Sequence, residues 1–339
     1  MDTEDNVRLT LRNLLNSVEC ISARVRDGEA NEPDGDFNLS NFWDTLNQAA
    51  KAVSQEATKL CLAFSKPPLP SQQDAEQLSD SVLKSVLSLS TVYYWLPNSR
   101  GVALRQQVRD AVVQALEGLT QLLEVILTSP LQSLTQAQLT STGGVWSACD
   151  RFTRLPQDNK AAAVLVLSGQ SGIVKDAIEE LEQALLEAPS GDAPDQQEDG
   201  EEPHANQDAY WSVRDRCVVA ACQGMMKVAA ACLRKTTAAV RTRGDADAPQ
   251  RVEQLDRLLD AVKEISPGVD DLALCLYPPV DNNDADNHVT QLAALLTKVL
   301  TIIRSSHICG EAELTWLEFL DQAVDHNLQK AKNLLWLDS

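Results

Sequence analysis

Aromatic residues are scarce in this chain, since Phe, Trp and Tyr make up only 4% of its 339 residues. Leu, Ala and Val supply most of the 44% hydrophobic content, and these residue types favour helices over sheets. Long apolar runs are also lacking, because no stretch approaches the roughly 20 apolar residues that a membrane helix needs. The sequence therefore predicts a helical protein with enough apolar material for real cores and no membrane partner.

The motifs of common enzymes and cofactor sites are absent from the sequence. Neither G-x-x-x-x-G-K-[ST], nor G-x-G-x-x-G after a strand, nor G-x-S-x-G occurs. The glycine-rich stretch SGQSG at 168–172 lacks the lysine that a phosphate-binding loop requires. We therefore expect no enzymatic activity and no cofactor.

Metal-binding patterns are equally scarce. The four histidines form no H-x-x-x-H pair, and the eight cysteines form no C-x-x-C pair. Cys217, Cys222 and a distant histidine could form a zinc site, but this spacing is that of one helix and not of a metal knuckle. Most cysteines lie in apolar helical stretches, so we interpret them as reduced core thiols of a cytosolic or nuclear protein.

Basic residues are outnumbered by acids, 29 to 49, which leaves a formal net charge of −20. Such a charge repels phosphate backbones and anionic lipids, so direct binding to nucleic acid is disfavoured. Partners with basic surfaces are favoured instead.

What the sequence does contain is a series of helical patterns. Apolar residues recur every three or four positions in nearly every long segment, and Ser71 is suited to cap the segment that follows it. Gly169 and Gly172 weaken the middle of 157–188 and favour a kink or a break there. The expected helices number about ten, with no convincing strand: 4–27, 39–65, 71–96, 99–128, 157–188, 209–242, 249–262, one after 266, 286–308 and 312–337.

One segment interrupts these patterns. Residues 188–208 contain seven acids and no base, are rich in Pro and Gly, and hold few apolar residues. Such a composition is typical of disorder. We therefore expect an all-α protein of two antiparallel helical bundles, 1–188 and 209–339, joined by an acidic disordered linker at 189–208.

The stretch ISPGVDDLALCLYPP at 265–279 looks more like a site than any other segment. Ser266 is suited to cap a short helix, with Pro267 in its first position and Pro278 at its end. Asp270 and Asp271 then complement the positive end of that helix. As neighbours they diverge by about 100° and would not converge on one metal or proton. Apolar residues surround more than one face of this segment, which predicts a short buried helix or one that a partner covers: Val269, Leu272, Leu274, Cys275 and Leu276.

Two Ser-Pro dipeptides, Ser266-Pro267 and Ser129-Pro130, are minimal sites for proline-directed phosphorylation. A charged phosphate at either serine would change the local electrostatics.

Four segments in this order resemble the cyclin-D-binding protein family. They are FNLSNFWDTLNQAAKAVSQEATKL (37–60), VYYWLP (92–97), LPQDNKAAAVLVL (155–167) and EISPGVDDLALCLYPP (264–279). The similarity runs from about residue 37 to the C-terminus. Ser266, Pro267, Asp270, Asp271, Leu272, Tyr277 and Pro278 belong to the last of these family segments.

The resemblance implies two helical bundles similar to talin and vinculin modules, in a cytoplasmic and nuclear regulator. The implied partners are D-type cyclins and helix–loop–helix transcription factors, and the implied effect is to restrain cell-cycle progression. A talin- or vinculin-like cytoskeletal or scaffold module is the alternative, because a helical bundle alone does not determine function. The oligomeric state and the surface that binds partners stay open at this point.

Overall fold

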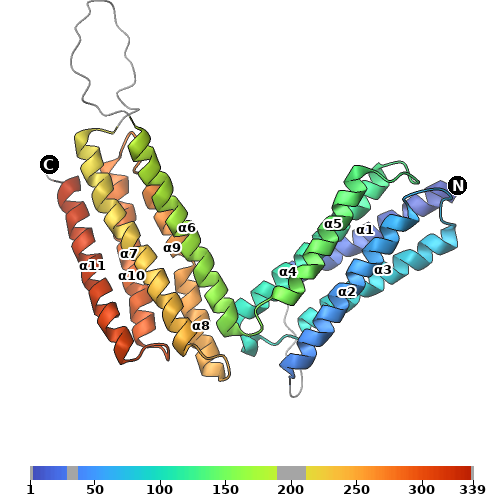
Figure 1. The fold of residues 1–339 in the computed structure, drawn as a ribbon, viewed down its shortest axis with the longest axis horizontal. Helices are drawn as coiled ribbons and strands as arrows, with labels where there is room; N and C mark the ends of the chain where they lie inside the picture. Colours follow the sequence, from blue (N-terminus) through green and yellow to red (C-terminus); the bar gives the residue numbers. More distant parts are fainter. Residues whose placement is uncertain (1–2, 29–36, 189–210, 337–339) are drawn as a thin grey trace, which may run out of the picture. The chain divides into compact units, whose positions relative to one another are not determined.

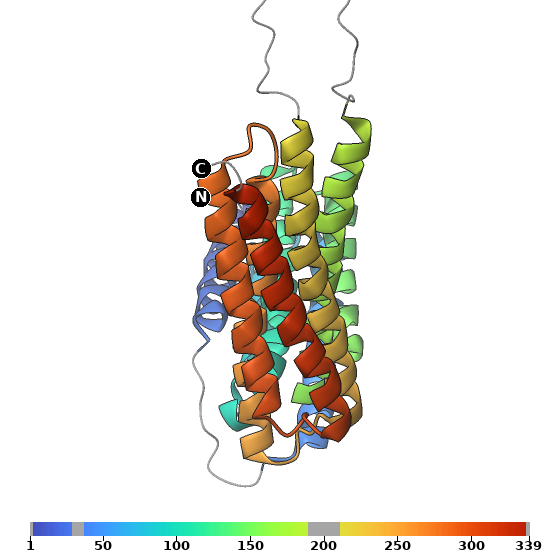
Figure 2. The ribbon, with the colours of Figure 1, turned by 90° about the vertical axis from the view of Figure 1, so that its left-hand side faces the viewer.

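The structure is a computed structural model that describes residues 3–28, 37–188 and 211–336. These residues form α-helices and two short 3₁₀ turns, without a strand among them, which confirms the expected all-α class (Figures 1 and 2). The expected disorder of 189–208 lies outside the described residues. The elements are α1 (Thr3–Asp27), α2 (Leu39–Ala63), α3 (Gln72–Tyr94), η1 (Asn98–Arg100), α4 (Val102–Thr128), α5 (Gln136–Asp150), η2 (Arg151–Arg154), α6 (Asn159–Glu187), α7 (Val213–Arg243), α8 (Pro249–Val262), α9 (Ile265–Leu274), α10 (Asn282–Arg304) and α11 (Glu311–Leu335).

The helices begin where local side-chain chemistry satisfies the free backbone N–H groups. Ser71 caps α3 as expected, because its hydroxyl oxygen accepts from the Asp74 N–H at 3.1 Å. At α7, the Ser212 hydroxyl accepts from the Asp215 N–H at 3.0 Å, and the Asp215 carboxylate accepts from the Ser212 N–H at 2.8 Å. This reciprocal pair is a capping box, which satisfies two N–H groups at once.

The buried faces follow the apolar periodicity. In α1, Val7, Leu11 and Val18 have no exposed surface, and they lie on the face that packs against α3 and α4. In α10, Val289, Leu296 and Val299 are likewise fully buried, and this helix packs against α11. Burial of one such side chain contributes roughly 1.5–3 kcal/mol, so these stripes determine which helix faces turn inward.

The residue contacts divide the chain into two compact units, residues 1–162 and 163–339. In the first unit α1 packs against α3 and α4, α2 against α3 and α5, and α4 against α5. In the second unit α11 packs against α7 and α10 (Figure 2), and α9 packs against α10.

The division at residue 162 differs from the expected boundary at 188. Nearly all of α6 falls in the second unit, where it lies beside α7 and α9 in Figure 1. The Lys227 ammonium pairs with Glu182 of α6 at 2.8 Å, and the Arg216 guanidinium donates to the Leu185 carbonyl at 3.1 Å. A break in composition therefore does not coincide with the break in packing. The helix is also continuous through Gly169 and Gly172, so it has no break at these residues.

Three helices, α4, α6 and α7, are long and apolar enough to cross a membrane by length and composition alone. This finding corrects the expectation from the sequence that no stretch is long and apolar enough for a membrane helix. Ala, Gly, Ser and Thr extend the apolar stretches of these helices without adding charge. In α4 and α7 the bundles bury 50% and 61% of the most apolar window, whereas in α6 only 28% is buried. Helix α6 thus exposes much of its apolar surface.

Candidate interaction surface

The start of α9 differs from the sequence expectation. The helix begins at Ile265, so Ser266 and Pro267 are its second and third residues, and Ser266 is not its cap. The preceding residues Lys263 and Glu264 keep near-helical backbone angles after the end of α8, which leaves no extended residue to act as an N-cap. Proline is tolerated here because the first turn of a helix lacks internal N–H partners.

Ser266 instead lies at the contact between α9 and α6. Its side chain is only 4% exposed, and its backbone N–H donates to the Gln170 side-chain oxygen at 3.3 Å. Gln170 therefore satisfies one of the free N–H groups at the start of α9. This contact joins a residue of α6 to a segment almost 100 positions later in the chain.

Asp270 and Asp271 lie in the second turn of α9, so they do not act on its positive end as expected. Burial raises the pKa of the Asp270 carboxyl above its usual range, and the charges of Asp271 and of Glu180 on α6 raise this pKa further. No ion pair with Lys or Arg involves these three acids in the described part of the chain. They form an acidic cluster without compensating cations.

The end of α9 is partly buried and partly open. Leu272 has no exposed surface, while Leu274 is 70% exposed. The helix ends at Leu274, four residues before Pro278, so this proline is not the residue that ends it. The Tyr277 ring lies 5.8 Å from the ring of Trp211, whose indole N–H donates to the Leu276 carbonyl at 2.7 Å.

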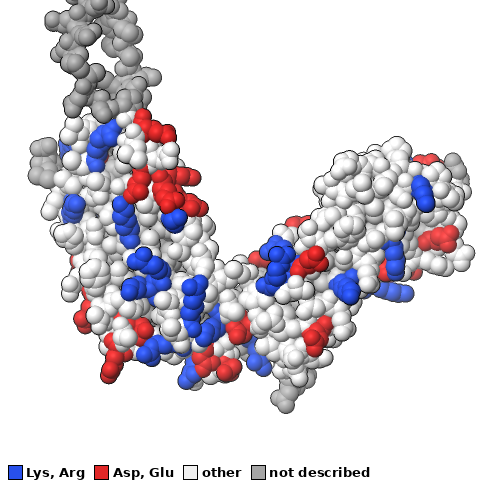
Figure 3. Space-filling view, viewed as in Figure 1, with Lys and Arg blue, Asp and Glu red and all other residues white. Residues whose placement is uncertain are grey.

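Gln170 contacts Ser266 and Glu180 acts on Asp270, so one face of α6 lies beside α9, and we call this region the α6–α9 surface. It combines two exposed apolar side chains with three acids: Ile173, Leu274, Glu180, Asp270 and Asp271. In Figure 3 acidic side chains gather over the C-terminal part of α6 and beside it. Exposed apolar side chains together with charged ones are typical of a protein–protein contact site.

Sequence reasoning found the α9 half of this surface and missed the α6 half. The sequence places Ile173 and Glu180 in the first bundle, because the acidic segment that follows them has the composition of a domain boundary. The available signal was the composition of α6, in which apolar residues such as Leu165 and Ile173 occur around the whole helix. A helix that is apolar on all sides is either buried on all sides or covered by a partner.

The two Ser-Pro sites differ in accessibility. Ser129 follows the last residue of α4, is half-buried and has an extended backbone, whereas Ser266 is buried within a helix. We expect a proline-directed kinase to phosphorylate Ser129 of the folded chain much faster than Ser266, because kinases bind extended, accessible segments. Mass spectrometry of phosphate occupancy over time measures the ratio. Peptides spanning 123–135 and 260–272 serve as controls for intrinsic preference, and equal rates in the folded protein would contradict the prediction.

Three buried thiols are held in their protonated form. Burial raises the pKa of Cys149, Cys222 and Cys232 to about 12, so these thiols stay protonated at neutral pH. Cys217 is exposed while Cys222 is buried. Among the described residues, no group of three or more His, Cys, Asp or Glu could hold a metal ion.

Comparisons with known proteins cover nearly the whole chain. Residues 45–187 match the family described as Grap2 and cyclin-D-interacting, N-terminal, and residues 194–301 match its C-terminal counterpart. A cyclin-D1-binding protein 1 homolog from Danio rerio is 56% identical over 333 residues, which are 98% of this chain and 97% of that protein. Its counterpart from Xenopus laevis is 50% identical over 326 residues, covering 96% and 98%. Cyclin-D1-binding protein 1 from Homo sapiens is 38% identical over 336 residues, covering 96% and 92%.

Proposed function

Because this chain belongs to the Grap2 and cyclin-D-interacting protein family, we propose that it binds a D-type cyclin through the α6–α9 surface. The relatives are named for binding cyclin D1, and that name supports the identity of the partner. The location is supported by the unneutralised acids Glu180, Asp270 and Asp271 beside exposed Ile173 and Leu274. The protein acts as a binding partner that restrains cell-cycle progression by occupying the cyclin.

The observation that carries this location is the acidic cluster of Glu180, Asp270 and Asp271, none of which forms an ion pair among the described residues. Burial disfavours the ionised form of the Asp270 carboxyl, and repulsion by the like charges of Asp271 and Glu180 adds to this effect. A basic surface on the partner would relieve this repulsion, so binding is more favourable here than at an acid that already has a cation. The apolar residues beside the acids supply the contact area that charge alone does not provide.

Calorimetric titration of the full chain with a purified D-type cyclin tests the proposal. We expect saturable binding that weakens as salt rises, because exposed charge pairs are screened. Asp270→Asn together with Asp271→Asn should weaken binding about three- to tenfold, since exposed pairs contribute roughly 0.2–1 kcal/mol each.

The same substitution also bears on stability. Because folding raises the Asp270 pKa, the ionised carboxylate destabilises the folded chain at pH values above that pKa. Asn should therefore leave thermal stability at pH 7 unchanged or slightly higher.

Glu253→Gln is the matched control, because Glu253 is exposed on α8 and belongs to no ion pair in the described part of the chain. Equal weakening by this control would point to a general charge effect and contradict the assigned surface. No heat of binding with folded wild-type protein would contradict direct cyclin binding. Binding to helix–loop–helix factors and a location in cytoplasm and nucleus stay predictions from the resemblance.

A further inference from the structure

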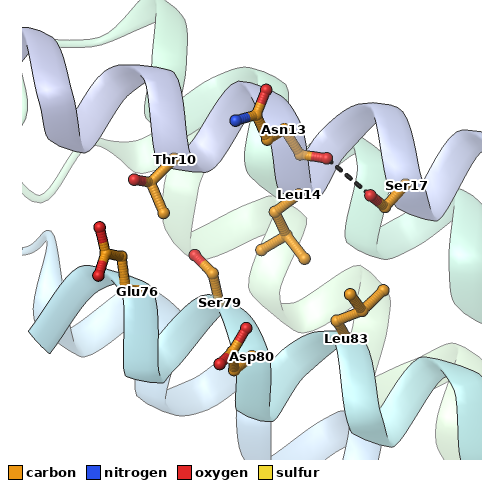
Figure 4. A pocket seen from close by; sticks show the side chains of 8 residues that line it. All are labelled: Thr10, Asn13, Leu14, Ser17, Glu76, Ser79, Asp80 and Leu83. Atoms are coloured by element: carbon orange, nitrogen blue, oxygen red, sulfur yellow. Dashed lines mark hydrogen bonds between the residues drawn. The ribbon is translucent and has the colours of Figure 1, made fainter. Parts of the chain in front are cut away.

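The first unit contains an open pocket of about 270 Å³ between α1 and α3. Figure 4 shows Thr10 and Leu14 on the α1 side and Glu76, Ser79 and Leu83 on the α3 side. This volume is roughly nine times the share of one water in the liquid, which is about 30 Å³. The pocket is therefore large enough for an organic group.

Ser79 is an unsatisfied polar group in this pocket. Its side chain is only 8% exposed, and its hydroxyl has no hydrogen-bond partner. Two other buried serines of α3 behave differently, because Ser85 donates to the Val82 carbonyl and Ser90 to the Val86 carbonyl, both at 2.7 Å. In Figure 4 the Ser79 hydroxyl is directed into the space between α3 and Thr10 of α1. Leaving such a buried hydroxyl unpaired is unfavourable, so a ligand that pairs with it is favoured.

The polar groups that face the pocket are mainly hydrogen-bond acceptors. The Thr10 hydroxyl donates its proton to the Asn6 carbonyl at 3.1 Å, and the Ser17 hydroxyl donates to the Asn13 carbonyl at 2.8 Å. Both protons are therefore already engaged, which leaves only the lone pairs of these oxygens for a further contact. Apart from the Asn13 amide and the Ser79 hydroxyl, which also contain donors, the lining offers acceptors to a ligand.

Two carboxylates give the pocket a negative charge. Glu76 and Asp80 lie one helical turn apart on either side of Ser79, and both line the pocket. Neither carboxylate forms an ion pair in the part of the chain that the structure describes. Glu76 accepts one hydrogen bond, from the Gln72 side-chain amide at 2.9 Å. A ligand with donors only and a positive charge matches this lining.

We propose that the α1–α3 pocket binds an ammonium or guanidinium group carried on an aliphatic stem, as in a Lys or Arg side chain. The cation lies between Glu76 and Asp80 and donates to the Ser79 hydroxyl oxygen. The stem packs against Leu14 and Leu83, the apolar part of the lining. The pocket lies in the first unit and the α6–α9 surface in the second, so the two sites are tested separately.

A two-dimensional NMR titration of the full chain tests this site. The probes are N-acetyl-lysine N-methylamide and N-acetyl-arginine N-methylamide, with N-acetyl-norleucine N-methylamide as the neutral control. We expect the two cationic probes to shift the backbone amides of 10–17 and 76–83 with about millimolar Kd, because exposed ion pairs are weak. The neutral probe should leave these amides unchanged. Equal shifts with the neutral probe, or no shifts with either cation, would overturn the proposal.

Three variants assign the contacts. Asp80→Asn should raise the Kd about two- to fivefold, while Asp44→Asn, an exposed acid on α2 outside the pocket, should not change it. Ser79→Ala should weaken binding and also raise the unfolding midpoint, because the variant removes an unpaired buried hydroxyl. An Asp80→Asn variant with wild-type affinity would contradict the assigned role of the carboxylates.

Spermidine, which offers ammonium groups without a peptide backbone, distinguishes two sources of the cation. Tighter binding of a tetra-arginine peptide than of spermidine would assign the pocket to a partner protein, and the reverse order to free polyamine. Either order of affinities supports the cation site, whereas the absence of binding by both the peptide and spermidine would overturn it. Cyclin binding by Asp80→Asn should equal that of the wild type.

Discussion

Leu272→Asp is expected to unfold the second unit. Leu272 has no exposed surface and lies on the face of α9 that packs into the bundle. The substitution loses the burial of a leucine, which costs about 2–5 kcal/mol, and places a carboxylate where it has no partner. The combined loss is comparable to the whole stability of a typical domain, about 5–15 kcal/mol. Urea unfolding followed by circular dichroism should show loss of the helical signal of residues 163–339.

Leu274→Asp is the matched control, because the same change is made two residues later on the same helix. Leu274 is 70% exposed, so a carboxylate there stays in water and the unfolding midpoint should change little. This variant also alters the α6–α9 surface without unfolding it, which separates loss of binding from loss of structure. Hydrogen exchange should show that α1–α5 stay protected in both variants. A Leu272→Asp protein that unfolds like the wild type would show that α9 is a docking element and not part of the core.

Gly101→Ala is expected to destabilise the first unit by about 3 kcal/mol or more. Gly101 precedes α4 with φ of +112°, a backbone conformation that residues with a Cβ rarely adopt. A Cβ at this position would lie 2.0 Å from the Cγ of Asn159. Asn159 cannot move away easily, because its side chain is fully buried and its Oδ1 accepts from the Leu104 N–H at 3.0 Å. Backbone strain of roughly 1–3 kcal/mol therefore adds to the loss of a buried hydrogen bond.

The same substitution at Gly144 should change the stability of the first unit in the opposite direction. Gly144 lies inside α5, and a Cβ there would meet no atom within 4 Å. Alanine favours a helix over glycine by about 1 kcal/mol, so Gly144→Ala should stabilise the first unit by up to that amount. Equilibrium urea unfolding of both variants measures the two free energies. A Gly101→Ala protein as stable as the wild type would show that the contact with Asn159 relaxes without cost.

The sequence by itself determined those features that depend on neighbours in the chain. The apolar periodicity of α1 and α10 indicated their buried faces, and Ser71 indicated the start of α3, because caps and stripes act over four to seven residues. The family segments correctly indicated the relatives of the chain, and composition correctly indicated the all-α class. The Ser266 segment was found as well, although its role as a cap was wrong.

Only the tertiary structure decided where the units divide and what Ser266 and Asp270 contact. The acidic segment after α6 is conspicuous in sequence, yet the packing breaks near residue 162, because a domain boundary depends on which helix faces meet. Gln170 reaches Ser266, and Glu180 raises the pKa of Asp270, across nearly 100 residues of chain. No local pattern encodes such pairings, since they arise from the summed burial of whole helix faces and not from any one residue. For the same reason the orphaned hydroxyl of Ser79 appears only once α1 and α3 are placed side by side.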